Sequence, residues 1–247
     1  MKKRHIYLLC LSILFSCTVK KNKASFLIES LIIPQNDYEF WDFSKNGKGS
    51  INKNLEWKTR NIKFSDSTLI SDGIYENSGR FTSEKAFLFD KNNDLSTKSI
   101  AISFKFAKKY PKKNNILPIL VKGQYYRCVR ILAKENEIIV KVNGNFSFTI
   151  PNEDIIMKSI KYNPNVFNTL YLSWNTKKSQ FYIALNDNPF QKITIPADFE
   201  WHKCGSNFTI QDYSSGSAFK GEINYLLIAN DFLNRRSMKN LILKNRN

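Results

Sequence analysis

Much of the chain alternates between apolar and polar residues with a period of two, the pattern of half-buried strands. Residues 100–106 place their large apolar side chains on one predicted face, and residues 138–142 and 146–150 repeat the alternation around Asn143-Gly144. That dipeptide fits a type I′ turn and predicts a hairpin. Residues 170–174 and 181–185 predict a second hairpin. Strands at intervals of about ten residues, with turn signals between them, indicate a β-sandwich.

The last stretch, Phe219 to Leu243, predicts one more strand and then a short helix. Gly221 is expected to form a turn before this strand. Asn234 is placed as the helix N-cap, where its side chain can accept a hydrogen bond from a backbone N–H group. Leu233 and Met238 on either side of it have the spacing of a hydrophobic staple. The strand residues expected on one face are Ile223, Tyr225, Leu227 and Ala229.

This closing segment resembles that of the laminin-G-like and pentraxin-like jelly rolls of the concanavalin A-like lectin/glucanase superfamily. In those proteins a "phenylalanine, x, glycine, x, isoleucine, aspartate" strand precedes an asparagine and a leucine-anchored helix. The matching residues are Phe219, Gly221, Ile223, Asn230, Leu233 and Leu241, whereas Asn224 stands where aspartate is usual. The aromatic stretch Tyr38 to Ser50 and the hairpin around Trp174 resemble two further segments of the family.

The resemblance covers roughly residues 36–243. It implies an all-β fold: an antiparallel two-sheet jelly-roll sandwich, concanavalin A-like, with a short C-terminal helix. Residues 36–247 are therefore expected to form one concanavalin A-like or laminin-G-like domain.

The N-terminus has the features of an export signal. Three basic residues precede Ile6 to Phe15, an apolar run that is too short to span a bilayer and suits a signal peptide. The following Leu14-Phe15-Ser16-Cys17 resembles a bacterial lipobox, which implies a signal peptide over 1–16 and lipidation of Cys17. Residues 17–35 are then a lipid-anchored tether and lead-in. These features predict a bacterial cell-envelope lipoprotein, held by its anchor in the outer membrane. A plain secretory signal is the alternative.

Two cysteines, Cys128 and Cys204, remain in the predicted domain. An exported chain meets an oxidising compartment, where these residues can form a disulfide; two buried free thiols are the alternative. The formal net charge of the chain is +17. Without residues 1–16, which contain three basic residues and no acidic one, it is 35 − 21 = +14. The charge is spread along the chain, so we expect no specific nucleic-acid partner.

The acidic residues and the histidine do not form a catalytic pattern. Glucanases of the superfamily carry a Glu-x-Asp-x-Glu or Glu-x-Asp-x-x-Glu strand, and this sequence contains neither. The close acidic pairs Glu135/Glu137 and Glu153/Asp154 are expected on the surface. A histidine triad would have to use His202, the only histidine outside the signal peptide. We therefore expect a protein without enzymatic activity.

Calcium is the only cofactor for which the sequence offers ligands. Asp90, Asn92 and Asp94 place oxygen atoms at positions one, three and five of a short segment, and calcium prefers oxygen ligands. The segment lacks the glycine and the distal glutamate of an EF-hand. An asparagine- and aspartate-rich turn without metal is the alternative.

Aromatic residues outside the core-facing register are the candidate ligand contacts. They are Tyr125, Tyr126, Arg127, Trp201 and Tyr213. Exposed rings can stack on sugar C–H faces while Arg and amide groups bind hydroxyl groups. The first hypothesis is thus a non-catalytic, carbohydrate-binding envelope lipoprotein. A structural or protein-interaction lipoprotein, whose partner is an envelope protein, is the second, and a divergent glycoside hydrolase is the third.

Overall fold

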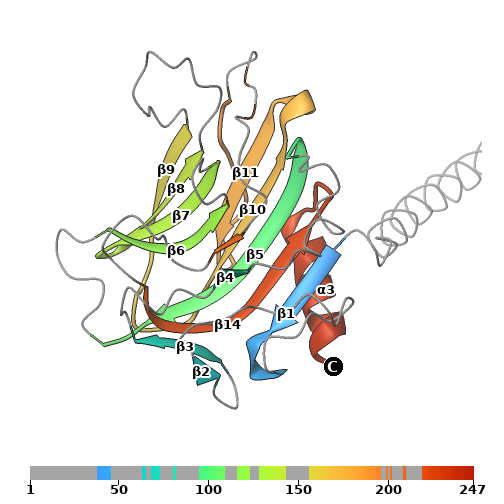
Figure 1. Ribbon diagram of the computed structural model, residues 1–247. Coiled ribbons are helices and arrows are strands. Elements are labelled where there is room, and N and C mark those ends of the chain that lie inside the picture. Colours follow the sequence, from blue (N-terminus) through green and yellow to red (C-terminus); the bar gives the residue numbers. More distant parts are fainter. Residues whose placement is uncertain are drawn as a thin grey trace, which may run out of the picture. The chain divides into compact units, whose positions relative to one another are not determined.

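The computed structural model shows two antiparallel β-sheets packed face to face and one C-terminal helix (Figure 1). It describes residues 38–45, 63–64, 68–72, 80–81, 95–108, 116–122, 128–142, 156–195, 199, 201, 208–209 and 219–247. They lie in a compact unit, Asn36–Asn247. In these ranges no helix is long and apolar enough to cross a membrane. The predicted two-sheet jelly-roll fold with a short C-terminal helix is confirmed.

The larger sheet has eight strands, and β14 lies near its centre. In spatial order the strands are β12 (Gln191–Lys192), β11 (Gln180–Leu185), β10 (Asn168–Asn175), β5 (Thr97–Phe106), β14 (Lys220–Ala229), β3 (Leu69–Asp72) and β2 (Lys63–Phe64). The eighth strand, β1 (Tyr38–Asp42), also pairs with β14. The helix α3 (Arg235–Arg246) follows β14 in the chain, and the short 3₁₀ helices are η2 (Phe43–Lys45) and η5 (Thr176–Lys178).

The smaller sheet has six strands. In order they are β4 (Arg80–Phe81), β13 (Phe208–Thr209), β6 (Ile116–Lys122), β7 (Val129–Lys134), β8 (Glu137–Val142) and β9 (Ile156–Lys161). The strand β8 pairs along its whole length with β7 on one side and β9 on the other. The predicted pairing of 138–142 with 146–150 is therefore wrong, because residues 156–161 take the place beside β8.

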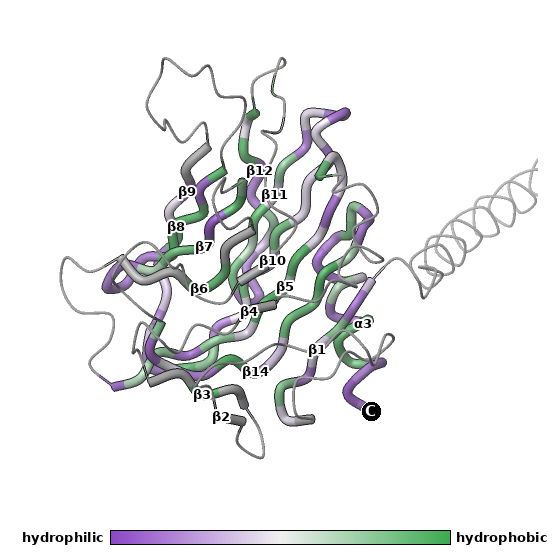
Figure 2. The backbone as a smooth tube through the Cα atoms, in the orientation of Figure 1, coloured by the Kyte–Doolittle hydropathy of each residue, from purple (hydrophilic) through white to green (hydrophobic). Residues whose placement is uncertain are grey.

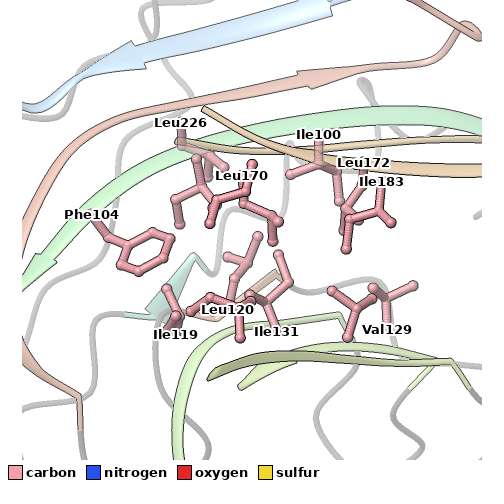
Figure 3. Close-up of a cluster of buried hydrophobic side chains, with 14 of the residues drawn as sticks. Ile100, Phe104, Ile119, Leu120, Val129, Ile131, Leu170, Leu172, Ile183 and Leu226 are labelled. Carbon is pink, nitrogen blue, oxygen red and sulfur yellow. The ribbon is translucent and has the colours of Figure 1, made fainter. Parts of the chain in front are cut away.

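The main core lies between the two sheets, where the apolar faces of their strands meet. Figure 3 shows Ile100, Phe104, Leu170, Leu172 and Ile183 of the larger sheet opposite Ile119, Leu120, Val129 and Ile131 of the smaller one. Trp174 is fully buried there, and its ring stacks on Phe181 at a centroid distance of 5.4 Å. Its Nε1 donates a hydrogen bond to the Leu95 carbonyl at 2.6 Å, so its polar atom is satisfied.

The hairpin around Trp174 is confirmed. Strands β10 and β11 pair with Trp174 opposite Phe181, and η5 forms the predicted turn between them. Asn175 caps η5 by accepting a hydrogen bond from the Lys178 N–H, and Ser179 ends it in the left-handed conformation.

The strand β14 differs from its prediction at two positions. Gly221 is not in a turn but inside the strand, where a Cβ atom would lie 2.1 Å from the Lys105 carbonyl oxygen. A β-bulge then lies between Ile223 and Tyr225. Because one extra residue exchanges the two faces of a strand, Ile223 points into the main core with Leu226 and Ile228. The expected common face of Ile223, Tyr225, Leu227 and Ala229 is therefore wrong.

The outer face of the larger sheet holds α3 through a small polar network. The Leu233 N–H donates to the hydroxyl groups of Ser99, at 2.8 Å, and Ser173, at 3.1 Å. Ser99 in turn donates to the Asp231 carbonyl at 2.7 Å. The predicted N-cap is confirmed, since the Asn234 side chain accepts from the Ser237 N–H, and both predicted staple residues, Leu233 and Met238, are buried. Figure 2 shows the middle of β5 and β14 as hydrophobic and the C-terminal end of the chain as hydrophilic.

Candidate functional site

Most of the predicted ligand contacts lie outside the described residues. They are Tyr125, Tyr126, Arg127 and Tyr213, together with the calcium candidates Asp90, Asn92 and Asp94 and the lipidation site Cys17. The described ranges contain no group of three His, Cys, Asp or Glu side chains that could hold a metal ion. Glu135 of the acidic pair is exposed in the β7–β8 turn, where its φ of 40° is a turn conformation.

Trp201 is the one predicted ligand contact that the structure describes, and it packs against the main core. Its ring centroid is 5.7 Å from that of Trp174 and 5.1 Å from that of Phe199. Its Nε1 is buried and has no hydrogen-bond partner among the described residues. Its contact with a ligand stays a prediction.

Cys128 is buried and disulfide-bonded. The alternative of a buried free thiol is therefore wrong for this residue. Cys204 lies outside the described residues, so its pairing with Cys128 stays a prediction.

Three half-exposed aromatic rings form a cluster on the outer face of the larger sheet, beside the start of α3. We call Tyr182, Phe190 and Phe232 the outer aromatic patch. The Tyr182 ring lies between the other two, with centroid distances of 6.0 Å to Phe190 and 5.7 Å to Phe232. Three separate segments supply the rings: β11, the loop before β12, and the loop between β14 and α3.

The loop that carries Phe190 is held by hydrogen bonds from β10 and by contacts from α3. The Asn186 side chain accepts from the Thr169 N–H at 2.8 Å, and the Asn186 N–H donates to the Thr169 carbonyl at 2.8 Å. Asn186 adopts the left-handed conformation, with a φ of 54°. From α3, Arg235 donates to the Asn188 carbonyl, and Lys239 forms an ion pair with Asp187. The backbone that carries Phe190 is therefore rigid, which lowers the entropy cost of binding at the patch.

Polar groups lie around the patch. Lys192 is exposed and stands opposite Tyr182 in the β11–β12 register, and Asn188 is exposed in the adjoining loop. Deeper on the same face, the Tyr225 hydroxyl lies 2.9 Å from the Thr169 hydroxyl. Burial raises the pKa of the neighbouring Tyr171 well above its usual value, so the Tyr171 hydroxyl stays protonated. The surface thus combines flat rings, amides, hydroxyl groups and a cation.

Sequence reasoning missed this patch for a definable reason. Tyr182 lies in the predicted strand 181–185, at a position that alternation assigns to the polar face, so an aromatic residue there is a signal that the sequence contains. Phe190 and Phe232 lie in loops, where alternation carries no information about direction. Only the return of the chain from β14 to α3 brings Phe232 beside Tyr182.

The architecture defines the fold class: an antiparallel two-sheet jelly-roll sandwich. No protein-family model matches the chain, and no curated protein matches it either. Solved structures with the same fold do match.

The carbohydrate-binding module CBM40 of the Ruminococcus gnavus IT-sialidase, bound to α2,3 sialyllactose, is one of them. It has a TM-score of 0.52 and 13% identity over 71% of this chain and 95% of the module. The binding domain of botulinum neurotoxin DC in complex with SialylT has a TM-score of 0.63 and 12% identity. The match covers 85% of this chain and 52% of that domain.

The sialidase of Trypanosoma rangeli also matches, with a TM-score of 0.60 and 12% identity over 84% of this chain and 32% of the enzyme. The chain thus spans almost all of the sialidase module, about half of the toxin domain and about a third of the enzyme. Likeness at this level of identity establishes the fold and leaves function to be argued from the site.

Proposed function

We propose that this protein is a non-catalytic lipoprotein of the bacterial cell envelope whose jelly-roll domain binds carbohydrate. The observation that carries the proposal is the length of the match to the sialyllactose-bound module. The similarity extends over 95% of a carbohydrate-binding module, and over only 32% of the complete sialidase from Trypanosoma rangeli. The shared part therefore corresponds in size to a binding unit.

The outer aromatic patch is the surface we assign to this binding among the described residues. A pyranose ring presents C–H groups on its faces and hydroxyl groups at its rim. The Tyr182 and Phe232 rings can contact the first, while Asn188 and Lys192 are placed to bind the second. The lysine would favour an acidic sugar, in line with the net charge of the chain. The predicted contacts Tyr125, Tyr126, Arg127, Trp201 and Tyr213 stay separate candidates for ligand binding.

A glycan array probed with the mature chain tests the proposal, at low and physiological salt and with or without calcium. We expect selective binding at physiological salt that falls at least ten-fold in the double variant Tyr182→Ala/Phe232→Ala. Phe167→Ala is the matched control, because Phe167 is a 38% exposed ring outside the patch. A loss in Tyr126→Ala instead would move the site to Tyr126. Binding that disappears with salt would show only the net positive charge, and no binding to any glycan would reject the proposal.

A protein-interaction role is the second candidate, and a different surface favours it. Ile70, Val166 and Phe167 are exposed by 39, 47 and 38%. Ile70, Glu222 and Lys105 stand side by side across β3, β14 and β5, and the Lys105 ammonium lies 4.8 Å from the Phe167 ring centroid. If this surface binds an envelope protein, Phe167→Glu should abolish co-purification of that protein and leave glycan binding unchanged.

We also propose that the partner of Cys128 is Cys204, as expected for an exported chain. Thiol titration of the unfolded mature protein should detect one free cysteine in Cys204→Ser and none in the parent chain. A bridge that closes a loop of this length stabilises a protein by about 4 kcal/mol in the chain-entropy account, so the variant should unfold at a lower urea concentration. A free thiol in the parent chain would contradict the pairing.

A further inference from the structure

The helix α3 is strongly basic. Its sequence, RRSMKNLILKNR, contains five basic residues and no acidic one. Arg235 and Arg236 lie in the first turn, where the helix dipole disfavours positive charge. The charges of Arg235 and Arg236 are therefore not explained by the helix dipole, whereas Lys244 and Arg246 lie in the last turn, where the dipole favours positive charge.

Three of the five cations have partners within the domain. Arg235 donates to backbone carbonyls of the loop after β11, and Lys239 pairs with Asp187. Arg246 lies 3.3 Å from the Asp42 carboxylate and donates to the Asn224 side chain at 2.6 Å. Together these contacts fasten α3 to the sheet along its length.

The other two cations, Arg236 and Lys244, are exposed and bind no described residue. The spacing of eight residues puts them on one side of the helix. Next to Lys244 is Leu243, which at 60% has the greatest exposed fraction among the large exposed hydrophobic side chains of the described ranges. The buried residues Ser237, Met238, Leu241 and Ile242 face the sheet. We call Arg236, Leu243 and Lys244 the outer stripe of α3.

The chain enters the described domain beside this helix. Tyr38 begins β1, and its hydroxyl accepts a hydrogen bond from the Asn245 side chain of the last α3 turn at 3.3 Å. Only twenty residues, 18–37, separate Tyr38 from the predicted lipidation site Cys17. Twenty residues span at most about 70 Å. A chain of this length keeps Tyr38, and with it the end of α3 that carries Leu243 and Lys244, within reach of the membrane that holds the anchor.

We propose that the outer stripe of α3 docks on anionic lipid headgroups of the membrane that holds the anchor. Arg236 and Lys244 bind the headgroups, and Leu243 enters the boundary of the acyl chains. This inference rests on the lipid anchor of the proposed function and is independent of glycan binding. The anchor holds the stripe at a high local concentration of lipid, so weak contacts are sufficient.

Tryptophan quenching in proteoliposomes tests the proposal. Mature, lipidated protein carrying Leu243→Trp is placed in vesicles of phosphatidylcholine brominated on its acyl chains, with or without 30% phosphatidylglycerol. The parent chain is measured in parallel to subtract its own tryptophans. Lys161→Trp is the matched control, because Lys161 is exposed on β9, on the far side of the sandwich (Figure 1).

We expect the new tryptophan at 243 to be quenched at least two-fold more than that at 161 in the anionic vesicles. The excess should disappear in pure phosphatidylcholine, in 0.5 M salt and in the background Arg236→Glu/Lys244→Glu. Each removed cation should weaken docking about five-fold. Equal quenching at 243 and 161, or an excess that is indifferent to lipid charge, would overturn the proposal. Flotation of the chain with pure phosphatidylcholine vesicles reports the anchor alone, so a missing anchor is distinguished from missing docking.

Discussion

The two faces of the larger sheet are built from alternate residues of the same strands, yet they differ in chemistry. On β10 the inner face is Leu170, Leu172 and Trp174, all fully buried in the main core. The outer face carries Thr169, Tyr171 and Ser173, whose polar atoms bind other parts of the chain. The inner face is held by packing, which is non-directional, and the outer face by hydrogen bonds, which need one geometry.

On β14 the inward and outward positions exchange at one place. The bulge beside Asn224 exchanges the faces, so that the apolar residues after it enter the core while Tyr225 turns outward, with its ring 5.8 Å from that of Phe40. Arg246 at the end of α3 donates to Asn224. The same residue that sets the alternation of β14 thus helps to hold the helix.

Deleting Asn224 should have the largest effect on the stability of the fold. Without the extra residue, either every residue of one half of β14 faces the wrong side or the strand loses its register. We expect no cooperative unfolding transition and no protected β-sheet amides in hydrogen exchange. Asn224→Ala keeps the chain length and is the control; it should lose only the Arg246 contact and about 1 kcal/mol. A folded deletion variant would show that the bulge does not determine the faces.

The second-largest effect on stability is expected on the inner face. Trp174→Ala removes a fully buried ring and should reduce the free energy of unfolding by about 3–5 kcal/mol, measured by urea denaturation. Trp174→Phe preserves most of the volume but leaves the Leu95 carbonyl without this donor, and should cost about half as much. If both variants cost the same, the hydrogen bond and not the packing would dominate this part of the core.

The two faces also explain what the sequence could predict. Alternation located the inner face of β5, β10 and β11, because packing in a sandwich needs only apolar residues at every second position. The chemistry of helix capping located the start of α3 at Asn234. The bulge has no comparable signal in the sequence, since Asn224 is one polar residue in a strand where apolar and polar residues alternate. The partner of β8 depends on a long connection, whereas Asn143-Gly144 suggested a local hairpin.

The candidate site was harder to predict than the fold. Trp201 lies outside a clear strand pattern, so the sequence gives no direction for its side chain; the structure packs its ring against Trp174. Phe190 and Phe232 come from loops that meet only in the folded chain. A binding surface assembled in this way has no spacing that a sequence can reveal.

On the outer face, Ser99→Ala should give an intermediate effect. Ser99 is fully buried, donates to the Asp231 carbonyl and accepts from the Leu233 N–H. Its loss should reduce the free energy of unfolding by about 2 kcal/mol. Ser173→Ala should cost less, because the Leu233 N–H keeps its shorter bond to Ser99. Faster hydrogen exchange in α3 than in β10 would show that the loss is local to the outer face. Equal acceleration in both elements would mean that helix and core unfold as one unit.

The smallest effect is expected at the ion pair between Asp187 and Lys239, which is exposed to solvent. The hydrogen bond and the charge of Lys239 hold the pKa of the Asp187 carboxyl below its ordinary value of 3.8. A carboxyl whose pKa is lowered on folding contributes stability that is complete above the ordinary pKa and is lost as the pH falls through the lowered one. Lys239→Gln should therefore raise the pKa of Asp187, as followed by the carboxyl ¹³C shift in an NMR titration. The unfolding free energy near neutral pH should change little, because exposed ion pairs are screened by water and salt. A pKa that does not move in Lys239→Gln would show that this contact does not hold α3 to the hairpin end.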